Sequence, residues 1–211
     1  SFWIGSSETL AENAADPLPS PSSSLPPQPL TFNVWLDARP MGAHRYEFEG
    51  TPERFSVRST ANFNVKVVFV TVFDYQHEAQ ESWTGNCLTG LKSDTTTNGE
   101  AEELVLEIPL EPCAGTYSHW DKQRLLRPAL TNAQTGEMED ATVSQLGPKP
   151  LPRIGNRKPV RPATTSASTL ALQTASASFE LYYDANDELL MMQTENDGRT
   201  ITYLSDRLSV R

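Results

Sequence analysis

Apolar and polar side chains alternate with a period of two residues along most of the chain after residue 29. In residues 31–37, Phe32, Val34 and Leu36 face one way, whereas Trp35 falls on the opposite face. This alternation is typical of a β-strand with one buried face. It recurs as far as residue 110 and again from residue 166 onwards. The pattern therefore predicts a mostly β fold.

Turn signals divide the alternating segments into hairpins. Asn98-Gly99 and Asp197-Gly198 are dipeptides favoured in two-residue hairpin turns. Between such turns, residues 65–73 (VKVVFVTVF) are β-branched and almost continuously apolar. We therefore expect one buried central strand there, followed by a strand over residues 74–83. The succession of hairpins predicts an antiparallel meander.

Residues 113–137 interrupt the β pattern. Ser118 is a suitable N-cap and Pro128 stops a helix, so a short helix is expected over residues 118–127. Because strands precede and follow it, we expect this helix to plug the sheet. The sequence thus predicts a curved antiparallel sheet, either a β-meander half-barrel or an open barrel, with one short helical plug.

Composition separates a tail from the rest of the chain. Residues 1–29 are rich in Pro and Ser and cannot bury enough apolar surface to fold alone. We expect residues 30–211 to form a single β domain. Within it, residues 147–162 are a basic, proline-rich loop, which is either solvated or contacts an acidic partner or anionic lipid headgroups. Its basic residues are Lys149, Arg153, Arg157, Lys158 and Arg161.

The overall charge narrows the classes of partner. The 211 residues carry a formal net charge of −10, and the sequence pI is about 4.8. An acidic surface repels phosphate backbones, so we expect no nucleic acid partner. No apolar run approaches the ~20 residues of a membrane-spanning helix. Residues 1–16 also lack the basic start and the long apolar stretch of a secretory signal.

The chain contains two cysteines, Cys87 and Cys113. An even number of cysteines in an exported protein allows a disulfide, which would stabilise by roughly 3–4 kcal/mol for a loop of this size. Two buried free thiols are the alternative, and the sequence leaves both open.

Residues with reactive side chains form no recognisable motif. His44, His77 and His119 belong to different expected elements, and no metal-ligand spacing joins them. Ser118 lies beside His119, but a catalytic triad needs nucleophile, base and orienting group to meet in space. The sequence also lacks a nucleophile elbow, a phosphate-binding glycine loop and a dinucleotide fingerprint. We therefore name no catalytic residue, no metal site and no cofactor.

Aromatic residues are the remaining candidates for a binding site. A sheet with apolar side chains on both faces must cover both, and one face can enclose a cavity. In one interpretation Trp120 simply plugs the curved sheet from its helix. In the other, Tyr117 and Trp120 lie at the mouth of an apolar cavity, with Trp35 and Trp83 among its lining residues.

Four motifs carry a resemblance to a known family. They are Val34-x-Leu36-Asp37 with Pro40-x-Gly42-x-His44-x-Tyr46, then Tyr75-x-His77 ending at Trp83, then Tyr117-x-x-Trp120-Asp121, then Leu130-x-Asn132-x-Gln134-Thr135-Gly136. Over residues 31–204 the chain resembles an uncharacterised family of proteobacterial exported proteins, known as a domain of unknown function. This resemblance implies export but no activity. More loosely, a meander wrapped on a helical plug is similar to the half-barrels of periplasmic lipoprotein carriers.

Three functions from different classes follow. The leading hypothesis is a non-enzymatic, periplasmic or otherwise exported domain that binds an apolar small molecule or lipid in the concave face of its sheet. The alternative is an accessory subunit that docks to a larger membrane-associated assembly through residues 1–29. The third is an enzyme of unknown type that uses His77, His119 or Asp121.

Overall fold

The computed structural model describes residue 25 and residues 29–67, 70–116, 120–125, 129–160, 166–175 and 177–211. Almost all of the tail, Tyr117, His119 and Arg161 therefore lie outside the described residues, and so do the predictions made for them. Leu25, which is described, packs against the main core.

Eleven strands form one antiparallel sheet in the order β10-β12-β13-β14-β15-β1-β2-β3-β4-β5-β6. The first six in sequence are β1 Leu30–Leu36, β2 Arg39–Thr51, β3 Arg54–Val67, β4 Val70–Thr84, β5 Cys87–Thr97 and β6 Glu100–Glu107. The others are β10 Thr142–Lys149, β12 Ala167–Gln173, β13 Ser178–Tyr183, β14 Leu189–Asn196 and β15 Arg199–Ser205. β1 pairs with both β2 and β15, so it joins the first and last parts of the chain.

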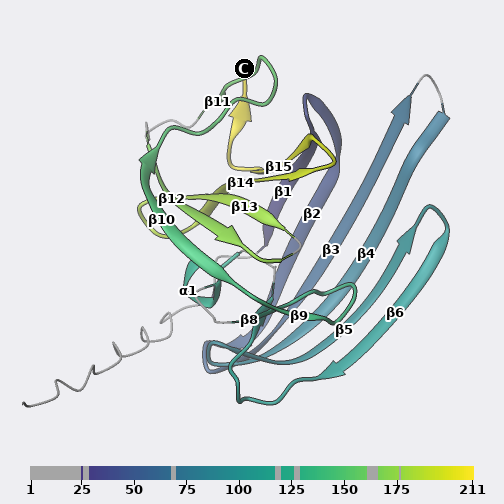
Figure 1. Ribbon diagram of the computed structural model, residues 1–211, viewed down its shortest axis with the longest axis vertical. Helices are drawn as coiled ribbons and strands as arrows, with labels where there is room; N and C mark the ends of the chain where they lie inside the picture. The colour runs from purple at the N-terminus through teal and green to yellow at the C-terminus, as the bar shows by residue number, and fades with distance from the viewer. Residues whose placement is uncertain are drawn as a thin grey trace, which may run out of the picture.

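The sheet is strongly curved and is not closed into a barrel, because β10 and β6 end it without pairing to each other. Figure 1 shows β3 to β6 sweeping along one side while β10 and β12 to β14 curl round towards them. The short elements α1, β8 and β9 lie between these two halves (Figure 1). The predicted fold class, a curved antiparallel sheet with a small helical element, is confirmed.

Both predicted hairpin dipeptides occupy tight turns. Asn98 and Gly99 connect β5 to β6 with φ of 51° and 90°, and Asp197 and Gly198 connect β14 to β15 with φ of 50° and 72°. Turns with two left-handed residues match the twist of the flanking strands, and Asn, Asp and Gly tolerate that conformation best. The register of both hairpins therefore follows from local sequence.

The prediction of one central strand over residues 65–73 is wrong. The segment belongs to two strands of a hairpin, in which Val65 is opposite Phe73 and Val67 is opposite Val70. Both arms of this hairpin are β-branched and apolar, and no Gly, Pro or Asn marks the reversal between them. A single buried strand and a hairpin end therefore give the same sequence pattern.

Within the described residues, the helix predicted over residues 118–127 begins later than expected, because Trp120 and Asp121 are not helical. Its described helical part is a single turn, α1, at Lys122–Leu125. A second sheet accompanies it, made of β7 Gly115–Thr116, β8 Ala129–Thr131 and β9 Met138–Asp140. Between β8 and β9, Gly136 turns the chain with a φ of 74°.

Two links attach the plug to β4 and β5. Cys87 and Cys113 form a disulfide, with Cα atoms 4.9 Å apart. Glu81 of β4 is fully buried, where its carboxylate accepts hydrogen bonds from Trp83 Nε1 at 2.9 Å and Thr116 Oγ1 at 3.0 Å. Hydrogen bonds of this kind offset the cost of burying a carboxylate.

The main core fills one end of the concave face. Trp120 contacts Phe48, Phe55 and Trp83, with ring centroids 4.8, 5.9 and 6.0 Å away. From the other half of the sheet, inward residues of β12, β13 and β14 complete the cluster. They include Leu170, Leu172, Leu181, Tyr183 and Met192.

A smaller core covers part of the convex face. Trp35 and Leu204 from the sheet pack there with Ile154 from the segment between β10 and the two-residue strand β11 Pro159–Val160. β11 pairs with β16 Ser209–Val210 near the end of the chain. Residues 147–162 are therefore not a free loop throughout, because their first part extends β10 and a later part covers the sheet.

Candidate functional site

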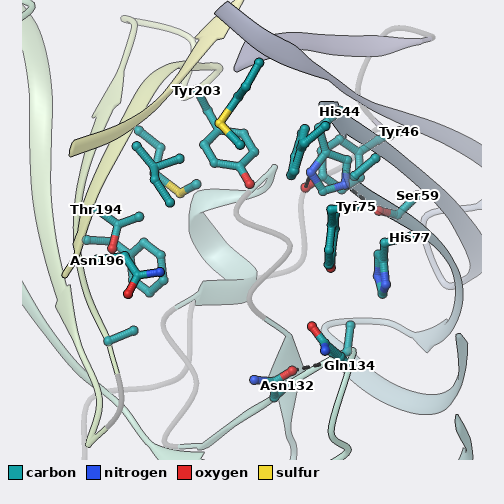
Figure 2. Close-up of a pocket in the computed structure, with 18 of the residues that line it drawn as sticks. His44, Tyr46, Ser59, Tyr75, His77, Asn132, Gln134, Thr194, Asn196 and Tyr203 are labelled. Carbon is teal, nitrogen blue, oxygen red and sulfur yellow. Dashed lines mark hydrogen bonds between the residues drawn. The ribbon is translucent and has the colours of Figure 1, made fainter. Parts of the chain in front are cut away.

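A cavity of about 440 Å³ occupies the other end of the concave face. Inward side chains of β2, β3 and β4 form one wall, and side chains of β14 and β15 with Phe179 of β13 form the opposite wall. The segment 132–134, after β8, closes one side. Figure 2 shows the polar residues of both walls pointing into this space.

Stacked rings cover the wall formed by β3 and β4. Phe73, Tyr75 and His77 follow one another at alternate positions of β4, with ring centroids 6.2 and 6.0 Å apart. Phe63 of β3 stacks on Tyr75 at 5.4 Å. Alternate residues of a strand point to one face, so these rings form a continuous aromatic surface.

The second wall is more aliphatic. Met192 of β14 and Ile201 of β15 face the cavity, with Thr194 and Asn196 further along β14. Tyr203 of β15 reaches across to the aromatic wall, where it meets Phe63 edge to face at 6.2 Å. The cavity is therefore apolar on both sides, with polar groups at specific places.

Three polar side chains form a hydrogen-bonded chain within the aromatic wall. His44 Nε2 lies 2.6 Å from Ser59 Oγ, and the hydroxyl of Tyr46 lies 3.4 Å from His44 Nδ1. His44 and Tyr46 also stack, with ring centroids 4.4 Å apart. The cross-strand pairing of β2 with β3, in which Tyr46 is opposite Ser59, brings the three side chains together.

Burial favours the uncharged forms of Tyr46, Tyr75 and His77 in this wall. Burial raises the pKa of Tyr75 to about 12 and that of Tyr46 well above its usual range. It lowers the pKa of His77, whose Nδ1 lies 2.8 Å from Thr95 Oγ1 of β5. A neutral imidazole is thus favoured at His77 because the charged form would lose its hydration.

The described residues that line the cavity include no Asp, Glu, Lys or Arg. At one edge, Gln134 donates from Nε2 to the carboxylate of Glu102 at 2.9 Å. Further along the inward face of β4, the buried Glu81 is close enough to contribute to the raised pKa of Tyr46. These contacts therefore place two carboxylates, those of Glu102 and Glu81, near the cavity, and both are negatively charged.

Ser59 and Ala61 are the reason for the open space. Along β3 the inward positions are Phe55, Val57, Ser59, Ala61 and Phe63, all buried. Large side chains thus stand at both ends of the series and two small ones stand in the middle. Among the described parts of the chain, no large side chain covers these small residues in the way that Trp120 covers the other end. The space therefore stays unfilled.

The described tryptophans proposed as ligand-lining residues lie elsewhere. Trp83 and Trp120 belong to the main core, and Trp35 lies in the small core on the convex face. None of them is among the residues that line this cavity. Tyr117 lies outside the described residues. Trp83 and Trp120 thus face the concave side and Trp35 the convex side, and the sequence could not tell filled from open space.

The basic residues proposed as partner contacts are spread over several local interactions. Lys149 Nζ pairs with Glu180 Oε1 at 2.7 Å, and the guanidinium of Arg157 lies 5.3 Å from the centre of the Trp35 ring. Arg153 donates to the carbonyl of Asn156 at 3.1 Å. Lys158 pairs through its backbone with Arg211. Arg161 lies outside the described residues.

Six of the residues that line the cavity were present in the family motifs. His44 and Tyr46 belong to the first motif, Tyr75 and His77 to the second, and Asn132 and Gln134 to the fourth. The fold brings these three motifs to one cavity (Figure 2). Membership of a family motif was therefore the sequence signal for these residues. Ser59, Ala61 and Tyr203 lie outside the motifs and carried no such signal.

The contact between Ser59 and His44 resembles a nucleophile with its base, but the paired backbone of β3 offers no oxyanion hole beside it. Ser59 stands in the middle of β3, opposite Tyr46 on one side and Ala79 on the other. Pairing on both sides uses the backbone N–H groups of the strand, so they cannot form an oxyanion hole. The described residues also contain no group of three or more His, Cys, Asp or Glu that could hold a metal ion.

Comparison with known proteins identifies the family. Residues 32–205 match the family described as a domain of unknown function (DUF6134). The chain belongs to this family, which confirms the resemblance to an uncharacterised family. No curated protein matches the chain. Within the described residues, no helix is both long and apolar enough to span a membrane.

One solved structure supports the fold. The chain is similar to a β-barrel-like protein of another domain of unknown function, DUF1849, from Brucella abortus, with a TM-score of 0.60 at 9% identity, over 90% of this chain and 100% of that one. LprF from Mycobacterium bovis aligns at a TM-score of only 0.27 and 10% identity, over 85% of this chain and 84% of that one. The first similarity shows a shared fold, and the second score is too low to support an argument.

Proposed function

We propose that this protein is a non-enzymatic binding domain that holds an apolar ligand in the cavity between the two halves of its sheet. The observation that carries the proposal is an unfilled cavity of about 440 Å³ in the same concave face that Trp120 fills at the other end. Small-molecule sites are typically concave, of roughly 300–1,000 Å³, mostly apolar and furnished with a few polar groups.

The chemistry of the lining favours binding over turnover. Aromatic and aliphatic side chains provide the contact surface, and each buried methylene of a ligand would contribute about 0.8 kcal/mol. The polar groups are hydroxyls, amides and imidazoles at fixed positions on paired strands, which suit orientation of a ligand. The domain would act in an oxidising compartment outside the cytoplasm, where a structural disulfide such as Cys87–Cys113 persists.

A cavity-filling variant tests the site. Ala61 lines the cavity in the middle of β3, so Ala61→Phe should fill the space and abolish binding of N-phenyl-1-naphthylamine, an uncharged dye that fluoresces in apolar surroundings. Titration of the dye should give one site per chain in the unaltered protein. Because no described tryptophan lines the cavity, the dye and not tryptophan emission is the appropriate signal.

Ala101→Phe is the matched control. Ala101 is exposed on the edge strand β6, outside the cavity lining. This variant should bind the dye as the unaltered protein does, and circular dichroism should show that both variants are folded. Equal dye binding by folded Ala61→Phe and Ala101→Phe, or no dye binding by the unaltered protein, would overturn the proposed site.

A further inference from the structure

We infer that the ligand is a single-chain amphiphile whose polar group is uncharged and is held by the hydrogen-bonded chain Tyr46–His44–Ser59. This inference rests on the proposed binding function and names the class of ligand. It depends on three independent properties of the cavity, namely its size, its lack of charge and its hydrogen-bonding capacity.

The size of the cavity limits the ligand to one chain. A volume of about 440 Å³ corresponds to roughly 15 groups the size of a water molecule, each of which occupies about 30 Å³ in the liquid. This is enough for one medium-length alkyl chain with a small polar group. A phospholipid with two acyl chains would have to leave most of its apolar surface outside.

The electrostatics exclude an ionised polar group. An ion transferred from water into an apolar site requires an opposite charge or several hydrogen bonds to compensate its lost hydration. Among the described lining residues none is Asp, Glu, Lys or Arg. The nearby carboxylates of Glu81 and Glu102 would repel a carboxylate or phosphate. A cation would meet no carboxylate within the described lining.

The hydrogen-bonded chain has one donor to spare. At least one nitrogen of the His44 ring carries a hydrogen, so the ring accepts from at most one of the two hydroxyls that contact it, those of Tyr46 and Ser59. The hydroxyl that is left over belongs to Ser59 or to Tyr46, depending on which nitrogen of His44 is protonated. Both residues line the cavity, so either arrangement presents an O–H donor to an oxygen of the ligand, such as that of an alcohol, ester or ketone.

A series of ligands with the same chain tests the class without any variant. Dodecanol, dodecanoate and dodecyltrimethylammonium are compared as competitors of N-phenyl-1-naphthylamine at about pH 8, where the carboxylate of dodecanoate is ionised. We expect dodecanol to bind at least tenfold more tightly than either ion. If either ion binds as tightly as dodecanol while the dye still binds, the ligand class is wrong and the site stands. If the dye does not bind, the proposed function itself fails.

Ser59→Ala tests the position of the polar group, with Ser56→Ala as the matched control. Ser56 lies on the same strand, where the alternation turns it away from the cavity. Ser59→Ala should weaken dodecanol binding about threefold to tenfold more than it weakens dye binding, and Ser59→Thr should restore dodecanol binding. Ser56→Ala should change neither. Equal weakening of dye and dodecanol by Ser59→Ala would overturn the assigned contact.

Discussion

The two ends of the concave face use the same strands in different ways. At one end Phe48 of β2 and Phe55 of β3 face inward and meet Trp120. At the other end Phe63 of β3 also faces inward, but it borders the cavity. We call the first the filled end and the second the hollow end. Alternation along the strands is the same at both ends, so the difference lies in what covers them.

This comparison shows how a single sheet can supply both a core and a binding site. The filled end receives the plug, which the disulfide and the hydrogen bonds of Glu81 hold against β4 and β5. The hollow end has small side chains at Ser59 and Ala61, and the loop at residues 132–134 borders it without filling it. The plugged core and the open space therefore lie at different parts of the same strands, and Tyr46 and Met192 stand at the boundary because they belong to the main core and also line the cavity.

The largest expected effect is a difference in stability between two matched substitutions, one phenylalanine at each end. Phe48 and Phe63 are both 8% exposed. Phe48→Ala should lower the free energy of unfolding by about 3–5 kcal/mol, because it leaves a new void against Trp120. Phe63→Ala should cost about 2 kcal/mol, close to the transfer free energy of the ring alone, because it only enlarges an existing cavity. Urea unfolding measures both.

Dye binding should rank the two variants in the opposite order to stability, with the larger change in Phe63→Ala. Phe63→Ala should alter dye affinity, because the ring is part of the cavity lining, whereas folded Phe48→Ala should not. Equal stability losses in the two variants would show that the hollow end is packed as tightly as the filled end in solution.

Removal of the disulfide should destabilise the filled end and leave the hollow end functional. The bond joins residues 26 apart, so the double variant Cys87→Ala/Cys113→Ala should lose about 3–4 kcal/mol on the chain-entropy model. Dye binding measured in the absence of denaturant should remain. Loss of binding by the folded double variant would instead show that the plug also shapes the cavity.

The smallest expected effect is a pH dependence of stability that comes from the hollow end. Burial lowers the pKa of His77 from its usual 6.5. Below about pH 6.5 the unfolded state binds a proton that the folded state does not, so stability falls until the pH reaches the folded pKa. Each pH unit within that window costs up to about 1.4 kcal/mol.

His77→Gln isolates this contribution. Urea midpoints at about pH 7.5 and about pH 5.5 bracket the upper part of the window. The variant should lose less stability between them than the unaltered protein, and carboxylates titrate alike in both. An identical loss in the two proteins would mean that His77 is hydrated, and hence that the cavity wall is wetter than its burial implies.

Local sequence determined most of the sheet. The hairpins at Asn98-Gly99 and Asp197-Gly198 could be predicted because these residues tolerate the left-handed backbone of tight turns. Alternation identified which residues of β1 face the core, since a strand has a period of two. The prediction of one strand over residues 65–73 was wrong, because the end of an apolar hairpin and a single buried strand have the same run of apolar residues.

The cavity, in contrast, was decided by tertiary structure. From the sequence, Trp83 and Trp120 were reasonable candidates for a lining, since large aromatic residues commonly form binding sites. They lie in the filled end because the disulfide, the buried carboxylate of Glu81 and the short elements after β6 place the plug over that part of the sheet. Alternation specifies only the face on which a side chain lies. Whether that face is packed or open depends on segments that are remote in sequence, and only the folded chain brings these together.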